Sequence, residues 1–287
     1  MEKINADLVY FRSSDGLELQ GALKRGKKRS NKLIIHVHGM TGDFCRGSFT
    51  RILFGSFINT GYDFFSINTR GAGVINKFYG KKKKYVIGTA RENVEDCIYD
   101  IDGAIRAGKK MGYKKFILCG HSTGCQKVAY YQGKKKNRLV ESVILLSPCD
   151  DYNVTRLELG NKKFNNYVRR ATKLLKEGKG NDKFEIPGNE YSAKRWLSFT
   201  DKKRVEAQLF NYDGRMHFFS KIKVPMLAVF GSKDYFADHD AKESLDILGK
   251  KTKSELLATA IVKGADHCYK GKEKELVKVV RRFIRLF

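Results

Sequence analysis

The segment Gly120-His121-Ser122-Thr123-Gly124 constrains the fold more than any other part of this sequence. It directly follows the apolar run 116–119 and directly precedes a stretch with helical character, so the chain must pass from strand to helix through a tight turn. A serine at such a turn takes a strained backbone conformation, and the glycines let neighbouring backbones approach. The amino end of the following helix favours negative charge that develops at the serine. The pattern predicts Ser122 as a nucleophile; the alternative is a tight turn without chemistry.

Short apolar strands alternate with amphipathic helices along most of the chain. The expected strands are 33–38, 63–68, 116–119, 143–146, 226–230 and 256–262. The expected helices are 46–59, 91–111, one that begins over 125–131, 245–248 and 276–287. This alternation predicts an α/β fold with a mostly parallel central sheet flanked by helices on both faces. The first 25 residues alternate apolar and polar positions around a Ser-Ser-Asp-Gly turn, which predicts an antiparallel hairpin at one edge of the sheet.

The stretch 150–222 interrupts this alternation, because it has helical character but no convincing core strand. Its apolar side chains are Tyr167, Leu174, Leu175, Trp196, Phe199, Leu209, Phe210, Phe218 and Phe219. An insertion of this size between two strands predicts a helical cap over the carboxyl end of the sheet, where such folds bind their ligands. The expected organisation is therefore a core of residues 1–149 and 223–287, with a helical cap insertion at 150–222.

A serine hydroxyl needs a base to take its proton, and the base needs an acid to orient it. His267 lies in the loop that follows the last expected strand, and Asp234 follows the strand 226–230. The chain order Ser122, Asp234, His267 is the order expected after a strand–turn–helix serine. The competing acids are Asp238, Asp240 and Asp266, with Asp150 or Asp151 as alternatives after the preceding strand. The weaker histidines are His36, His38, His121, His217 and His239, and a plain surface loop is the alternative for His267.

Acyl transfer also requires hydrogen-bond donors for the oxyanion. The backbone N–H of Thr123, directly after the serine, is the expected first donor. The second is expected from the loop His38–Gly42 after an early parallel strand, and its position favours the N–H of Met40.

The sequence gives weaker evidence for a metal site or for a catalytic cysteine. His36 and His38 are two residues apart on a strand and so share a face, but no carboxylate or cysteine is near them in sequence, and no metal site is expected. Cys125 falls inside the helix after Ser122, where a small core residue is the better interpretation. Six cysteines occur without a C-x-x-C pair, which favours free buried thiols.

The net charge of +26, from 57 Lys and Arg against 31 Asp and Glu, is unusual. Such a charge attracts nucleic acid, anionic membranes or acidic substrates at low salt. The basic residues are scattered over the chain, however, so a general lysine bias is favoured and no specific nucleic-acid partner is expected. No apolar run is long enough for a signal peptide or a membrane span, which favours a soluble, cytoplasmic protein.

Five motifs together resemble the α/β-hydrolase superfamily: HVHGMTG, NTRGAG, GHSTGC, FGSKD and GADH, in this order. The segments GHSTGCQKVAYY and LLSPCDDY are similar to a branch of uncharacterised-domain hydrolases that includes fungal siderophore esterases. A weaker resemblance links the chain to microbial cinnamoyl and feruloyl esterases. The resemblance implies ester hydrolysis without metal or organic cofactor, with Ser122, Asp234 and His267 in the triad positions.

The expected activity is therefore cleavage of a carboxylic ester through an acyl-enzyme intermediate. The same triad would also serve a thioesterase, an amidase or a C–C bond hydrolase, and a non-catalytic binding protein of the same fold is a further alternative. The expected partner is a small-molecule ester. Cap aromatics favour an aromatic substrate, and the cap arginines Arg169, Arg170 and Arg195 favour an anionic one. The oligomeric state is left open.

Overall fold

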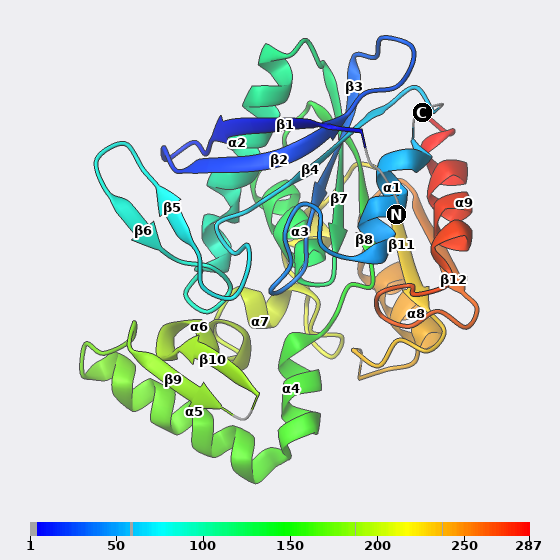
Figure 1. Ribbon diagram of the computed structural model, residues 1–287. Helices are drawn as coiled ribbons and strands as arrows, with labels where there is room; N and C mark the ends of the chain where they lie inside the picture. Colours follow the sequence, from blue (N-terminus) through cyan, green and yellow to red (C-terminus); the bar gives the residue numbers. More distant parts are fainter. Residues whose placement is uncertain (1–4, 58–59, 187, 237) are drawn as a thin grey trace.

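Eight strands form one sheet, which Figure 1 shows at the centre of the computed structural model. The structure describes residues 5–57, 60–186, 188–236 and 238–287. In spatial order the strands are β1 (Asp7–Arg12), β2 (Glu18–Lys24), β4 (Asp63–Ile67), β3 (Lys32–Val37), β7 (Lys115–His121), β8 (Val140–Leu146), β11 (Met226–Gly231) and β12 (Leu257–Val262). The strands from β4 to β12 pair in parallel, whereas β1 and β2 form an antiparallel hairpin at one edge. Both features confirm the sequence prediction.

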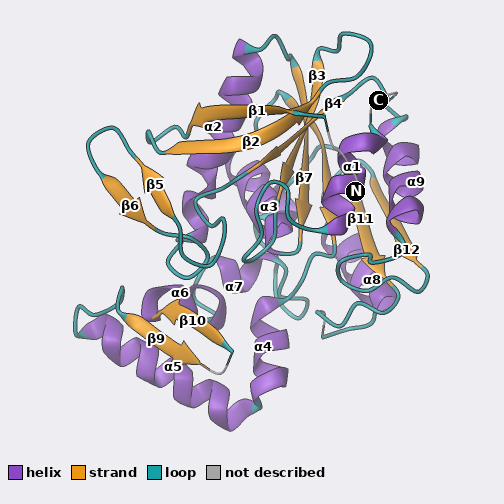
Figure 2. Ribbon diagram, viewed as in Figure 1, coloured by secondary structure: helices purple, strands orange, loops and turns teal. Residues whose placement is uncertain are grey.

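Helices cover both faces of the sheet (Figure 2). One face packs against α2 (Cys97–Lys110), α3 (Thr123–Lys135) and α8 (Ala241–Lys251), and the other against α1 (Ser48–Ser56) and α9 (Glu273–Ile284). Successive side chains of a strand point to opposite faces, so neighbouring residues enter different cores. Leu33 and Ile35 of β3 belong to the first core, and Ile34 belongs to the second. Two-sided burial explains why these strands are continuously apolar in sequence.

Some local elements differ from the prediction. A hairpin of β5 (Lys77–Tyr79) and β6 (Lys84–Val86) was not expected, because its strands are short and its turn is rich in lysine. The helix expected over 91–111 begins later, with a 3₁₀ turn at Val94–Asp96 before α2. The helix expected over 46–59 is observed as α1, and positions 58 and 59 lie outside the described residues.

The segment 150–222, called the insertion below, contains α4 (Asp151–Leu159), α5 (Asn161–Lys176), α6 (Ala193–Thr200) and α7 (Glu206–Leu209). It also contains an antiparallel hairpin of β9 (Lys183–Ile186) and β10 (Asn189–Ser192), so it is not wholly helical. Figure 1 shows α5 and this hairpin side by side, and they share an aromatic core with α6. The last part of the insertion does not pack on this aromatic core. Its Leu209, Phe210 and Phe219 belong instead to the core of the large sheet beneath α3.

Among the described residues, no helix combines the length and apolarity needed to cross a lipid bilayer. The six described cysteines are all free. Cys45 and Cys268 are exposed, which differs from the expected burial, and the other four are buried as expected.

Candidate active site

Ser122 lies at the junction of β7 and α3, with a backbone φ of 54° and ψ of −127°. Few non-glycine residues adopt a positive φ, and here the surrounding backbone enforces it. A Cβ on Gly124 would lie 2.1 Å from the carbonyl oxygen of Val37, and one on Gly120 would lie 2.4 Å from the backbone of Gly124. Only glycine at both positions allows this turn, as the sequence predicts.

His267 and Asp234 form a close pair at the ends of β12 and β11. The His267 Nδ1 atom lies 2.9 Å from Oδ1 and 3.1 Å from Oδ2 of Asp234. Both side chains are buried. Burial opposes ionisation of Asp234, but the hydrogen bond and charge of His267 lower the pKa of the carboxyl group below its usual value. The pair therefore has an ionised acid and an imidazole held by its Nδ1 atom, which leaves Nε2 for other partners.

The competing acids have other partners. Asp150 accepts hydrogen bonds from the backbone of Asn153 and Tyr212, and Asp151 from Gln126 and the thiol of Cys149. Asp240 caps α8, and Asp266 accepts from the backbone of its own loop. Asp238 lies 3.9 Å from His239. Within the described part of the chain, Asp234 is thus the carboxylate that contacts His267.

Ser122 and His267 line the same cavity, which has a volume of about 660 Å³. The insertion supplies much of its wall, and the remainder comes from the ends of the sheet strands, the loops that follow them and the start of α1. The apolar lining residues are Met40, Val154, Leu159, Ile186, Tyr191, Trp196, Phe199, Tyr235 and Phe236. Phe236 also packs on the imidazole of His267, with ring centroids 4.4 Å apart. Polar and charged side chains also line the cavity, among them Asp151, Thr155 and Glu158 of the insertion. A concave site that combines an apolar wall with polar groups is typical of small-molecule binding.

The residues that carry the two expected oxyanion donors lie in segments next to the serine. Thr123 is the first residue of α3, so its N–H has no partner within the helix. Gly39, directly before Met40, is pressed against the serine, because a Cβ on Gly39 would lie 2.9 Å from the Cβ of Ser122. Ser122, Thr123, Met40, Asp234 and His267 are thus brought to one end of the sheet.

The chain matches the model of a protein family described as "Protein of unknown function (DUF1749)" over residues 22–286. It belongs to the DUF1749 family. No curated protein sequence matches it.

Solved structures show which fold this DUF1749 protein has. Siderophore hydrolase EstB from Aspergillus fumigatus is similar with a TM-score of 0.72 and 15% identity, covering 99% of each chain. Est1E from Butyrivibrio proteoclasticus with bound ferulic acid has a TM-score of 0.70 and 18% identity, covering 96% of this chain and 98% of Est1E. The alpha/beta hydrolase domain-containing protein 10 from mouse has a TM-score of 0.63 and 17% identity, covering 97% and 98%. The DUF1749 chain therefore has the α/β-hydrolase fold.

Cys149 is a neighbour of the serine that sequence reasoning missed. Its Sγ atom lies 3.7 Å from Oγ of Ser122 and donates to Oδ1 of Asp151 at 3.2 Å. Burial raises the pKa of this thiol well above its ordinary value, so it remains protonated. The available signal was its position after β8, since the carboxyl ends of parallel strands meet at one edge of a sheet. Cys125, in contrast, is buried in α3 and donates to two backbone carbonyls, as expected of a core residue.

His36, His38 and His121 also line this cavity, and Nε2 of His121 lies 2.9 Å from the carbonyl oxygen of His267. Nδ1 of His36 lies 2.9 Å from Oγ of Ser66, whereas Nε2 of His38 accepts from the N–H of Thr69 at 3.2 Å. Burial lowers the pKa of His36 to about 3 and that of His38 to about 4, so both are neutral. Among the described residues, one group has spacing that could hold a metal ion, and it consists of Asp213, Asp238 and His239. That group includes none of the expected catalytic residues.

The insertion arginines do not line the cavity in the way that an anionic substrate would require. Arg195 is fully buried and forms an ion pair with Glu206, and Arg170 stacks on Tyr167 and Phe184. Arg169 is exposed and outside the cavity lining. The basic residue that does line the cavity is Arg46, from the loop before α1. Arg169, Arg170 and Arg195 thus do not line the cavity, and the preference for an anionic substrate stays a prediction.

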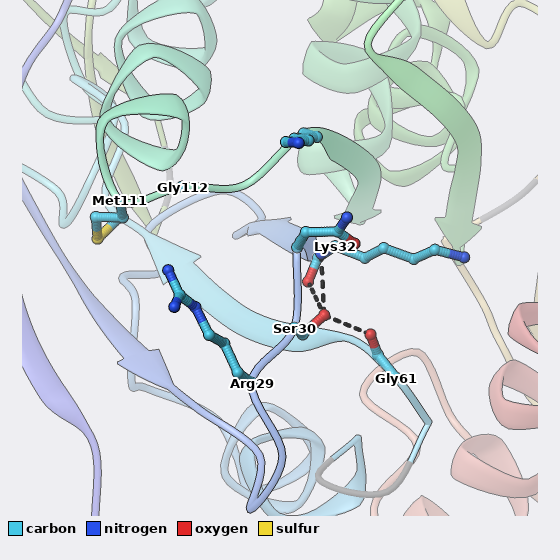
Figure 3. A pocket seen from close by; sticks show the side chains of 8 residues that line it. Arg29, Ser30, Lys32, Gly61, Met111 and Gly112 are labelled. Atoms are coloured by element: carbon cyan, nitrogen blue, oxygen red, sulfur yellow. Dashed lines mark hydrogen bonds between the residues drawn. The ribbon is translucent and has the colours of Figure 1, made fainter.

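A second cavity, of about 560 Å³, lies near the start of β3 (Figure 3). Ser30 holds its wall together, because its hydroxyl donates to the carbonyl of Gly61 and accepts from the N–H of Lys32. Its described lining residues include no carboxylate, histidine or cysteine. It therefore lacks a histidine–carboxylate pair that could activate a serine, and the cavity at Ser122 is the candidate active site.

Proposed function

We propose that this protein is a serine hydrolase that cleaves a carboxylic ester of a small molecule through an acyl-enzyme intermediate. One observation supports this most directly: Ser122, on a strained strand–helix turn, and His267, which is hydrogen-bonded to the buried Asp234, line the same cavity. Two proteins with this fold, siderophore hydrolase EstB and Est1E with ferulic acid, carry names or ligands that agree with ester chemistry.

The reaction proceeds in two steps. Oγ of Ser122 attacks the ester carbonyl carbon while Nε2 of His267 takes the serine proton, and the Met40 and Thr123 amides hold the oxyanion. The C–O bond to the alcohol then breaks, and His267 returns the proton to the leaving alcohol. A water molecule gives a proton to His267 and attacks the acyl-enzyme carbonyl carbon. The bond between this carbon and Oγ of Ser122 then breaks, His267 returns the proton to Oγ, and the carboxylic acid is released. Asp234 holds Nδ1 and stabilises the imidazolium in both steps.

The insertion serves as the cap in this proposal, over a core of residues 1–149 and 223–287. Its Val154, Leu159, Tyr191, Trp196 and Phe199 line the cavity and select the substrate by shape and apolar contact. Aromatic acyl or alcohol groups suit this wall better than small acetates.

Two measurements test the proposal. The first is hydrolysis of a panel of oxygen esters, thioesters and amides, graded in length and aromaticity, by wild type and Ser122→Ala. The second is labelling by a fluorophosphonate, with the modified residue identified by mass spectrometry. Ester hydrolysis that depends on Ser122 and labelling at Ser122 support the proposal. A folded wild-type protein that neither labels nor hydrolyses any compound is a binding protein, and faster thioester or amide cleavage changes the substrate class.

A further inference from the structure

The loop that presents the Met40 amide is held in place by a threonine outside the proposed triad. The N–H of Thr41 donates to Oγ1 of Thr89 at 2.8 Å, and the same hydroxyl donates to the carbonyl of Gly71 at 2.8 Å. Thr41 has a φ of 57°, in the left-handed region that non-glycine residues rarely adopt. Such a conformation persists only where surrounding contacts enforce it. The buried Thr89 hydroxyl is one of these contacts.

Thr89 is in turn held by the insertion. Nε of Arg195 donates to the carbonyl of Thr89 at 3.0 Å, and the next carbonyl, that of Ala90, accepts from the N–H of Ser192 at 2.7 Å. The guanidinium has little freedom, because Nη1 and Nη2 contact both carboxylate oxygens of Glu206 at 2.5 and 3.0 Å. A bidentate pair of this kind fixes the plane of the guanidinium, so the Nε–H is aimed at Thr89.

Contacts of Arg195 with other buried charged residues also extend to His38, at the other end of the loop 38–42. Glu92 lies 3.9 Å from Arg195 and 2.8 Å from Nζ of Lys127. Lys127 donates to Oγ1 of Thr69 at 3.1 Å, and the N–H of Thr69 donates to Nε2 of His38. Nδ1 of His38 is then left to donate to the carbonyl of Gly39, 2.8 Å away. Two buried cations and two buried anions thus balance each other behind the loop.

A third contact joins the insertion to Met40, the residue whose N–H is the expected oxyanion donor. The hydroxyl of Tyr191 donates to Sδ of Met40 at 3.2 Å, and the Met40 side chain packs against the aromatic core of the insertion. The insertion therefore contacts the loop 38–42 through Met40 directly and through Thr89 indirectly.

We propose that Thr89 and Arg195 are positioning residues that set the Met40 amide in its oxyanion-binding position, so the insertion contributes to turnover as well as to substrate choice. This inference rests on the proposed function. Binding the oxyanion matters in the transition state and little in the ground state, so loss of the positioning contact lowers kcat and leaves KM nearly unchanged. Loss of a whole oxyanion donor costs about 10²–10³ in kcat, and a displaced donor costs about 10–100-fold.

The decisive variant is Thr89→Val, which keeps the shape of the side chain but removes the hydroxyl. We expect kcat to fall about 10–100-fold with KM within about threefold, and affinity for a trifluoromethyl ketone to fall in parallel with kcat/KM. Thr89→Ser restores the hydroxyl and should recover most of kcat. Affinity for the alcohol product, which carries no oxyanion, should not change. A purely structural threonine would alter the melting temperature without this split.

Arg195→Lys tests the contact from the insertion. Lysine keeps the positive charge beside Glu206, but it has no Nε–H that could donate to the carbonyl of Thr89. Its expected effect is the same lowered kcat and weakened ketone binding. Arg170→Lys is the matched control on the same insertion, since Arg170 stacks on Tyr167 and Phe184 and does not contact the loop. If Arg195→Lys does not fold, kcat and ketone affinity of Thr89→Val still test the proposal.

The outcomes separate the two proposals. If wild type shows neither Ser122 labelling nor hydrolysis, the proposed function fails before any variant is compared. If wild type is active and folded Thr89→Val keeps wild-type kcat and ketone affinity, the function stands and this inference is overturned.

Discussion

The Nδ1 atom of His267 lies 2.9 Å from Oδ1 of Asp234, although 33 positions separate the two residues along the chain. The contact forms because β11 and β12 are adjacent and parallel, with Gly231 opposite Val262. Each strand ends at the same edge of the sheet, and the two loops that follow meet there. The loops are tightly packed, since a Cβ on Gly231 would lie 2.3 Å from the carbonyl oxygen of Ala265.

Replacing Ser122 by Ala should abolish esterase activity, because the histidine then has no hydroxyl to activate. Loss of a triad nucleophile lowers kcat by about a million-fold. Steady-state rates and thermal unfolding should show lost turnover with an unchanged fold, and Ser56→Ala on α1 serves as the control. A Ser122→Ala preparation, free of other esterases, that keeps several per cent of the wild-type rate contradicts the assignment.

Asp234→Asn should lower kcat by about 10⁴, because an amide cannot stabilise the imidazolium and can hold the wrong tautomer. Asp240→Asn is the control, since Asp240 caps α8 and does not contact His267. If Asp234→Asn is fully active while Asp150→Asn or Asp151→Asn is inactive, the acid lies after β8 instead.

The pH profile should show one ionisation on its acidic side. Because the pKa of Asp234 is lowered, this carboxylate stays charged above its usual pKa and adds no step to the profile. The ratio kcat/KM rises with pH because a general base acts only in its unprotonated form. Rates measured from about pH 5 to about pH 9 should fit a single group. The lowered pKa also stabilises the fold above the usual aspartate pKa of about 3.9, and this contribution disappears as the pH falls through the lowered value. A two-proton acidic limb would show that Asp234 titrates with the base.

Gly124→Ala should destabilise the protein strongly, because the added Cβ would lie 2.1 Å from the carbonyl oxygen of Val37. Overpacking of backbone costs at least about 1–3 kcal/mol. Gly249→Ala in α8 is the matched control: its Cβ would meet nothing within 4 Å, so the better helix former should be neutral or stabilising by up to about 1 kcal/mol. Denaturant unfolding of both variants measures the difference, and equal stabilities would contradict the tight turn.

The cavity wall on α4 should control the choice of ester. Leu159→Trp fills space in the cavity and should lower kcat/KM for bulky aromatic esters by about 10-fold or more, relative to an acetate. Leu157→Trp is the control, because Leu157 is 58% exposed and does not line the cavity. An unchanged ranking of esters in folded Leu159→Trp would show that substrates bind elsewhere.

Local patterns were sufficient for the architecture. Continuous apolar runs predicted buried parallel strands, and the alternating first 25 residues predicted the β1–β2 hairpin, because burial on two faces or on one face leaves different periodicities. The turn at Ser122 was predictable for a steric reason, since only glycine tolerates the backbone contacts at 120 and 124. The short strands β5, β6, β9 and β10 were missed, since strands of three or four residues carry too little periodicity.

The sequence alone determined the order of the strands of the large sheet and of the helices that cover it, the strained turn at Ser122 and a short set of candidate acids. Only the tertiary structure decided which acid contacts His267 and that Arg195 is buried against Glu206. The physical reason is that a side chain's partner and its access to solvent depend on which loops meet at the sheet edge. Charge and residue type are written in the sequence, but burial and distance arise from packing between segments that lie far apart along it.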